Sequence, residues 1–144
     1  MKHLKITAFV FVMTAFLGVF NSYARSKSTT KTPPVYMFGF AASFNDSIVY
    51  MTDIQAVDSA IIEHKSNFLV NRAAYANQLQ FFLMDNQKKS NATCVVFFDR
   101  KADKLQKKYQ KIMKRYQSNK ETLLQVLPKD QFHFVPEINK VLSE

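Results

Sequence analysis

Thr93–Tyr116, TCVVFFDRKADKLQKKYQKIMKRY, joins an unbroken apolar run to a long basic segment and decides the fold class. A run of apolar residues this short, bounded by polar ones, is typical of a strand buried on both faces, so we predict a strand over Ala92–Phe98. Asp99 is then the expected N-cap of the following helix. One arc of that helix is apolar and packs on the core, and it holds Ala102, Leu105, Tyr109, Ile112, Met113 and Tyr116.

The segments before this stretch predict a β-hairpin and a helix. Val35–Ser43 and Ile48–Thr52 are β-like runs on either side of the turn-forming residues Phe44–Ser47. Asn71 is the expected N-cap of an amphipathic helix over Arg72–Met84. Asp53–Val70 has apolar residues at roughly helical spacing, and a short helical turn could begin at its Asp58-Ser59 pair.

The segments after it complete the fold class. Thr122–Leu127 predicts a strand that Pro128 ends, and Pro136 opens a short closing helix. A strand, a helix and another strand in this order form a βαβ unit, in which the two strands run parallel. We therefore expect an α/β or α+β fold, with a mixed sheet of about four strands in the order β-β-α-β-α-β-α and helices packed on it.

The N-terminus has the pattern of a signal peptide. Lys2 and Lys5 precede the apolar segment Ile6–Phe20, which is shorter than the roughly 20 residues of a membrane span, and Ser22-Tyr23-Ala24 suits a signal peptidase. We expect a signal peptide over residues 1–24, a disordered linker over 25–34 and one domain over 35–144. The protein is then periplasmic or secreted and has no transmembrane segment after cleavage. A retained N-terminal anchor is the alternative.

The basic charge is concentrated in one segment. Residues 100–120 hold nine Lys and Arg side chains against Asp103 alone, a net charge of +8. The side of the helix opposite its apolar arc therefore predicts a contact surface for an anionic surface, glycan or protein; its residues are Lys104, Lys107, Lys108, Lys111, Lys114 and Arg115. Nucleic acid fits less well, because Tyr109 and Tyr116 fall on the apolar arc. A solvated surface without a partner is the alternative.

A polar cleft is the second candidate site, and it would support a small hydrolase-like enzyme. Asp99 follows a strand at the point where open α/β sheets place ligand sites. Asn45 and Asp46, in the hairpin turn, would meet it if the first strand of the hairpin ran parallel to the Ala92–Phe98 strand. Asp99 acting only as a helix cap is the alternative, so the chain is not assigned as an enzyme and no catalytic residue is named.

Several kinds of site are not predicted. His64 and His133 lie far apart and have no neighbour at ligand spacing, so we expect no metal site. Gly39 is the one glycine after the signal peptide, which excludes the glycine-rich phosphate and dinucleotide motifs, and no cofactor is expected. Gly39 itself indicates a bulge or a close backbone contact. Cys94, in the apolar run, is expected to be a buried structural thiol.

Two resemblances accompany these predictions. GFAASFNDSIVYMTDIQ, the NFLVNRAAYANQL segment and TCVVFF resemble small exported bacterial proteins of uncharacterised function, which implies export and no particular activity. Tyr36 and Tyr50, with Arg72 opening the next helix, resemble the layout of the GIY-YIG nucleases. The glycines that give that family its name are absent here.

Overall fold

The computed structural model of the protein describes residues 32–137. The predicted signal peptide and the linker up to residue 31 lie outside this range, as do residues 138–144 of the predicted closing helix. Pro136 and Glu137, where that helix was expected to begin, have no regular structure. None of the helices in the described part is both long enough and apolar enough to cross a bilayer.

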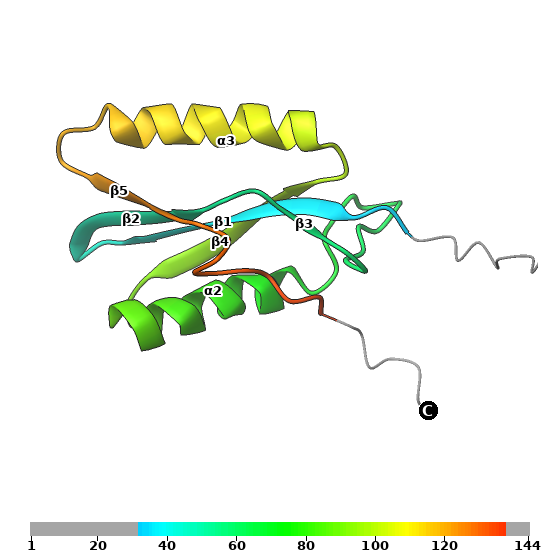
Figure 1. Cartoon of the computed structure of the whole chain (residues 1–144), viewed down its shortest axis with the longest axis horizontal. Coiled ribbons are helices and arrows are strands. Elements are labelled where there is room, and N and C mark those ends of the chain that lie inside the picture. The colour runs from blue at the N-terminus through cyan, green and yellow to red at the C-terminus, as the bar shows by residue number, and fades with distance from the viewer. Residues whose placement is uncertain (1–31, 138–144) are drawn as a thin grey trace, which may run out of the picture. The chain divides into compact units, whose positions relative to one another are not determined.

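The described residues form strands and helices in the order that the sequence predicts, with one short strand added (Figure 1). The elements are β1 (Val35–Ser43), β2 (Asp46–Thr52), β3 (Gln55–Val57), α2 (Arg72–Gln87), β4 (Thr93–Asp99), α3 (Ala102–Gln117) and β5 (Leu123–Leu127). The strands belong to one mixed sheet, so the predicted fold class is confirmed.

Strand β1 is the centre of the sheet because it pairs with three other strands. It runs antiparallel to β4 along one edge, from Tyr36 opposite Asp99 to Ala42 opposite Thr93. Its other edge pairs antiparallel with β3 and then with β2, and β2 pairs parallel with β5. Strands β4 and β5 therefore point the same way, as the predicted βαβ unit requires, but β1 and β2 lie between them.

The two helices cover opposite faces of the sheet (Figure 1). Alternate side chains of a strand point to opposite faces, so each strand supplies both sides of the core. On the α2 side, Met37 and Val96 belong to one buried cluster with Leu79. On the α3 side, Phe38 packs with Leu105 and Tyr109 in a second cluster.

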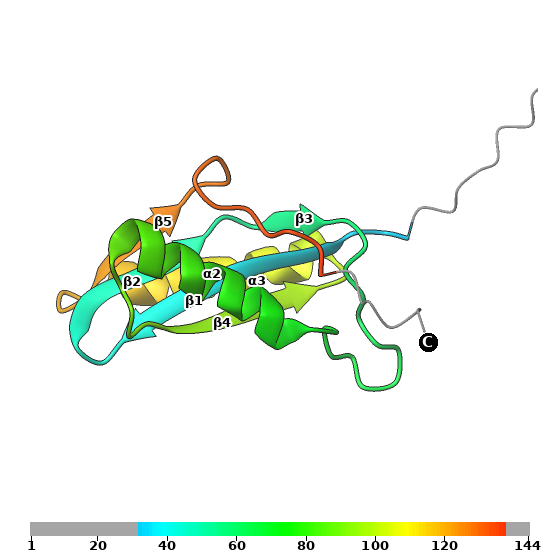
Figure 2. The ribbon, with the colours of Figure 1, turned by 90° about the horizontal axis from the view of Figure 1, so that it is seen from below.

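The segment after β5 closes the α2 side of the core. It runs beneath the sheet beside α2 (Figure 2) and brings the buried rings of Phe132 and Phe134 into the core. Gln55 is 3% exposed and holds this segment with both ends of its amide. Its Nε2 donates to the carbonyl of Phe132 at 2.9 Å, and its Oε1 accepts from the N–H of Phe134 at 2.8 Å.

The expectation of a helical turn at Asp58-Ser59 is wrong. Gln55 and Val57 are buried while Ala56 is exposed, which is the alternation of a strand, and these three residues form β3. Ser59 then has φ 64, a left-handed conformation that does not continue into a helix. The rest of the segment is a loop, closed by a β-bridge between Ile62 and Leu69.

Helix α2 begins where the sequence predicts, but Asn71 does not cap it as expected. Asn71 occupies the N-cap position in the left-handed conformation, with φ 57, and its side chain makes no capping hydrogen bond. A capping residue normally has extended φ and ψ angles that aim its side chain at the free amides of the first turn. Asn tolerates the left-handed conformation, which accounts for its presence here.

Candidate functional site

Helix α3 begins two residues later than the sequence predicts. Its N-cap is Lys101, which has extended backbone angles, so the prediction that Asp99 is the N-cap is wrong. The Oδ1 of Asp99 instead accepts the N–H of Lys101 at 2.8 Å. Asp99 therefore shapes the turn between β4 and α3 and not the first turn of the helix.

The basic face of α3 is exposed as predicted. Leu105 and Tyr109 are the buried residues of the helix, and all six predicted contact residues are exposed. With Asp103, these six give the helix a net charge of +5. Across residues 32–137, no acidic side chain forms an ion pair with any of the six, whereas Lys89 is paired with Asp46.

The six cations divide into two groups by their position around the helix. The helical repeat of about 3.6 residues places Lys107, Lys111 and Lys114 toward the solvent, opposite the buried residues. Lys104, Lys108 and Arg115 lie on the flank that faces β4. The Nζ of Lys108 is 5.3 Å from the centre of the Phe97 ring, a cation–π contact, and Arg115 lines a cavity with that same ring.

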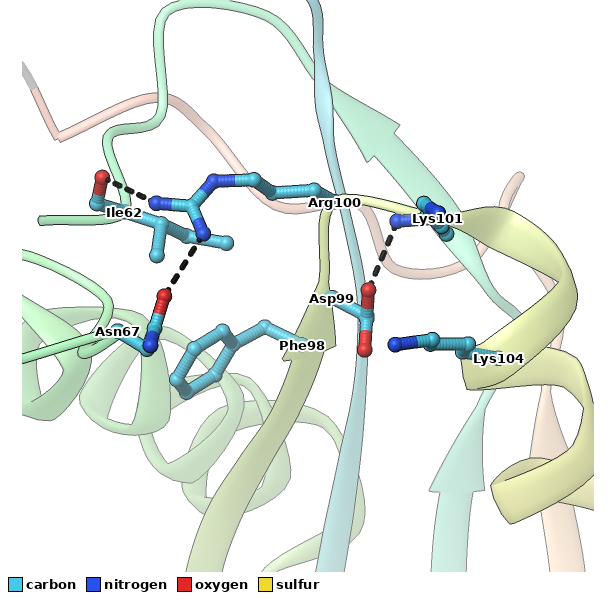
Figure 3. A pocket seen from close by; sticks show the side chains of 7 residues that line it. All are labelled: Ile62, Asn67, Phe98, Asp99, Arg100, Lys101 and Lys104. Atoms are coloured by element: carbon cyan, nitrogen blue, oxygen red, sulfur yellow. Dashed lines mark hydrogen bonds between the residues drawn. The ribbon is translucent and has the colours of Figure 1, made fainter. Parts of the chain in front are cut away.

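A cavity of about 330 Å³ lies where β4 passes into α3 (Figure 3). Its lining residues are Ile62, Asn67, Phe98, Asp99, Arg100, Lys101 and Lys104. The guanidinium of Arg100 turns away from the helix, because it donates to Asn67 Oδ1 at 2.9 Å and to the carbonyl of Ile62 at 3.0 Å. Arg100 therefore ties the loop before α2 to the end of β4.

Sequence reasoning missed this contact between distant segments. In the sequence Arg100 is one cation of the basic segment, and no pattern pairs it with Asn67. The one local signal in the sequence is the residue type of Asn67, because Asn adopts the left-handed conformation that it has here, with φ 56, more readily than most residues. Such a signal marks a turn and gives no information about what the side chain touches.

The predicted polar cleft does not form. Strands β1 and β4 are antiparallel, so the hairpin turn with Asn45 and Asp46 lies beside the start of β4 while Asp99 lies at its end. Asp46 is paired with Lys89, and this hydrogen bond, with a second from the N–H of Ile48, holds the pKa of its carboxyl below the usual value. The arrangement expected for a hydrolase-like site at Asp46 and Asp99 is therefore wrong.

The resemblance to the GIY-YIG layout also fails in the geometry. Tyr50 belongs to the buried cluster on the α2 side of the sheet. Tyr36 packs against the cluster on the α3 side, so the two hydroxyl-bearing side chains lie on opposite faces. Arg72 lies over the ring of Phe98, at 5.8 Å from its centre.

The remaining nucleophilic and ligand-type residues do not form a site in the described range. His64 and His133 are exposed, and residues 32–137 contain no cluster of His, Cys, Asp and Glu suited to a metal ion. Cys94 is free and half-buried, and burial raises the pKa of its thiol to about 11. A thiol with so high a pKa is a poor nucleophile at neutral pH.

Comparisons with known proteins leave the site to be interpreted from its own geometry. No protein-family model matches the chain, and no match was found among curated proteins or among solved structures.

Proposed function

We propose that this protein is an exported, non-enzymatic domain that binds an anionic partner through the basic face of α3. The observation that supports the proposal is the set of six exposed cations on one helix, none with an acidic partner in the described part of the chain. A helix fixed to the sheet by Leu105 and Tyr109 presents these charges in one rigid array.

The physical basis of binding is electrostatic attraction at the surface. Each exposed charge contributes little alone, because water and salt screen it, but an array of one sign attracts a polyanion over a Debye length of about 8 Å at physiological salt. A polyanion that spans several turns of α3 meets several cations at once. Binding of this kind weakens steeply as the salt concentration rises.

Among polyanions, nucleic acid remains the weaker candidate. Base stacking requires aromatic rings that are free on the basic surface. Tyr109 is 8% exposed and packs edge-on against Phe38, and Tyr116 packs against Phe40 with ring centres 5.1 Å apart. The Tyr109 ring is buried in the core and the half-buried Tyr116 ring is packed on Phe40, which favours a partner recognised by charge.

Binding to heparin and to vesicles that contain anionic lipid tests the proposal. Reversing Lys107, Lys111 and Lys114 to Glu should lower the affinity for the preferred probe by about a hundredfold at low salt. The matched control reverses Lys65, Lys88 and Lys129, which are exposed outside α3 and give the same change in net charge. Absent binding, salt-insensitive binding, or equal losses in the two variants would contradict the proposal.

Export has its own test. The protein expressed with its full N-terminus in a bacterial host should be recovered outside the cytoplasm with Arg25 as its first residue. Recovery of the full-length chain in the membrane fraction would identify the N-terminal segment as a retained anchor.

A further inference from the structure

Strand β4 leaves one edge of the sheet open. In the described part of the chain it pairs with β1 alone, and it lies at the border of the sheet in Figure 2. Natural proteins usually protect such an edge with charges, proline or a bulge. From Thr93 to Phe98 the strand carries none of these, so main-chain N–H and C=O groups along it are free to pair with another strand.

The α3 side of this edge is apolar and incompletely covered. Val95 and Thr93 lie beside Phe40 and Ala42 of β1, because these residues are direct partners in the β1–β4 ladder. A cavity of about 250 Å³ opens there; it is lined by Phe40, Ala42, Ser43, Phe44, Thr93 and Val95. The side chain of Phe44 is fully exposed at its rim.

A second cavity, of about 180 Å³, continues from the first across Phe40. Phe97 forms its floor, and Ile112, Arg115 and Tyr116 of α3 form its wall. Together the two cavities make a groove along β4, here called the β4 groove. Its floor is apolar, and its wall is the flank of α3 that carries Lys104, Lys108 and Arg115.

We infer that the β4 groove binds an extended segment of a partner protein, in which apolar and acidic residues alternate and which adds to β4 as a further strand. Strand addition satisfies the open main-chain groups, and alternate side chains of the added strand point to the same face. Acidic side chains on the α3 side then face the cationic wall, and the apolar side chains between them lie on the α2 side, next to the half-buried Cys94 and Phe98 of β4. The inference rests on the proposed function only in the charge of the partner.

The charges argue against a second copy of this chain as the occupant. Two β4 strands that paired antiparallel would be related by a two-fold axis perpendicular to the sheet, so both α3 helices would lie on the same face. Each carries a net charge of +5, and their cationic walls would face each other across the junction. An acidic strand provides the complementary charge instead.

The test uses the full mature chain and a short, capped, fluorescent peptide that alternates valine and glutamate. Fluorescence anisotropy should show saturable binding, and hydrogen exchange of the amides in β4 should slow when the peptide binds. Two control peptides separate the contributions. A lysine-for-glutamate peptide tests charge, and a peptide methylated at its backbone nitrogens keeps the charge but cannot donate main-chain hydrogen bonds.

Two protein variants test which side of α3 the peptide contacts. Lys108→Gln with Arg115→Gln removes two charges from the wall of the groove. Lys107→Gln with Lys114→Gln removes two charges at the same spacing from the solvent side of the same helix. The first should weaken peptide binding by about tenfold and the second much less, because exposed charges act mainly at short range.

The outcomes distinguish this inference from the proposed function. Equal binding of the methylated peptide, or equal effects of the two double variants, overturns strand addition at β4. A concentration-dependent dimer that protects the β4 amides without peptide also overturns it, since the edge would then be occupied by a second copy. If heparin binding still depends on Lys107, Lys111 and Lys114 in any of these cases, the proposed function stands without the groove.

Discussion

Gly39 in β1 lies directly beneath Leu79 of α2, and a Cβ added to Gly39 would stand 2.6 Å from Leu79 Cδ2. The same Cβ would be 3.3 Å from the Phe134 ring and from Thr52 Cγ2. Leu79 is fully buried and has little room to move. Gly39→Ala should therefore lower the free energy of unfolding by about 1–3 kcal/mol, as overpacking of a core does, and urea denaturation measures the change.

A second substitution shows whether this contact is the cause. In a Leu79→Ala background the added methyl group has space, so Gly39→Ala should cost less than it does in the wild-type protein. Contacting residues typically show such coupling in a double-mutant cycle. Strictly additive effects of the two substitutions would contradict the role of the Gly39–Leu79 contact.

Two glutamines form hydrogen bonds to the segment after β5, and their substitution should lower the free energy of unfolding by different amounts. Gln55→Met leaves the carbonyl of Phe132 and the N–H of Phe134 without their buried partner. The expected loss is about 3 kcal/mol of unfolding free energy, because unsatisfied buried groups cost about 1–3 kcal/mol each.

Gln78 provides the matched control for Gln55. It exchanges hydrogen bonds with the N–H and the carbonyl of Val135, both at 2.9 Å, and these bonds are exposed to water. Water can replace those bonds, so Gln78→Met should cost about 1 kcal/mol or less. Equal losses of unfolding free energy in the two variants would show that burial of the Gln55 amide does not increase the contribution of its hydrogen bonds to stability.

The ion pair between Asp46 and Lys89 predicts a pH dependence of stability. The pKa of Asp46 is lower in the folded protein than its usual value, so the stabilisation is present above the unfolded pKa and is lost as the pH falls through the folded one. Asp46→Asn keeps an acceptor for the N–H of Ile48 and removes the charge. The variant should be less stable than wild type at neutral pH.

Acidification should reduce this difference. At about pH 3, where carboxyl groups begin to be protonated in the wild-type protein, urea unfolding should show a smaller gap between wild type and Asp46→Asn than at neutral pH. A gap that does not change with pH would show that the charge of Asp46 contributes nothing.

Cys94 should react slowly with thiol reagents in the native protein. Its pKa of about 11 makes the reactive thiolate at least about a hundredfold scarcer at neutral pH than in an unfolded chain. Thr93→Cys in a Cys94→Ala background places a thiol on the neighbouring exposed position and should react much faster. Comparable rates for the two thiols would mean that burial does not protect Cys94.

The strands were predictable because their signals are local. The apolar runs of β1 and β4, and the Asn45-Asp46 turn between β1 and β2, each show in a few adjacent residues. The pairing was not predictable in the same way, because it depends on residues far apart in the sequence. The predicted cleft between Asp46 and Asp99 depends on whether β1 runs parallel or antiparallel to β4, and no local pattern carries that information.

The two surfaces of α3 differ in the same respect. The solvent side with Lys107 and Lys114 follows from the helical repeat alone, so the sequence predicts it. Prediction of the β4 groove requires two further facts, namely which edge of the sheet has no partner strand and which flank of α3 faces that edge. Both become known only when β1 has been assigned its three neighbours.

The pairing of β1 has a consequence for the order of folding. Among the described strands β1 is synthesised first, yet its longest ladder is with β4. Gln55 of β3 likewise donates to the carbonyl of Phe132, which lies 77 positions further along the chain. Contacts so distant in sequence form slowly, since the long intervening loop must close before they stabilise anything. A nascent chain that ends before Phe134 lacks an aromatic ring that is buried in the core on the α2 side. Truncation there should therefore prevent folding of the whole domain and not only of its C-terminal segment.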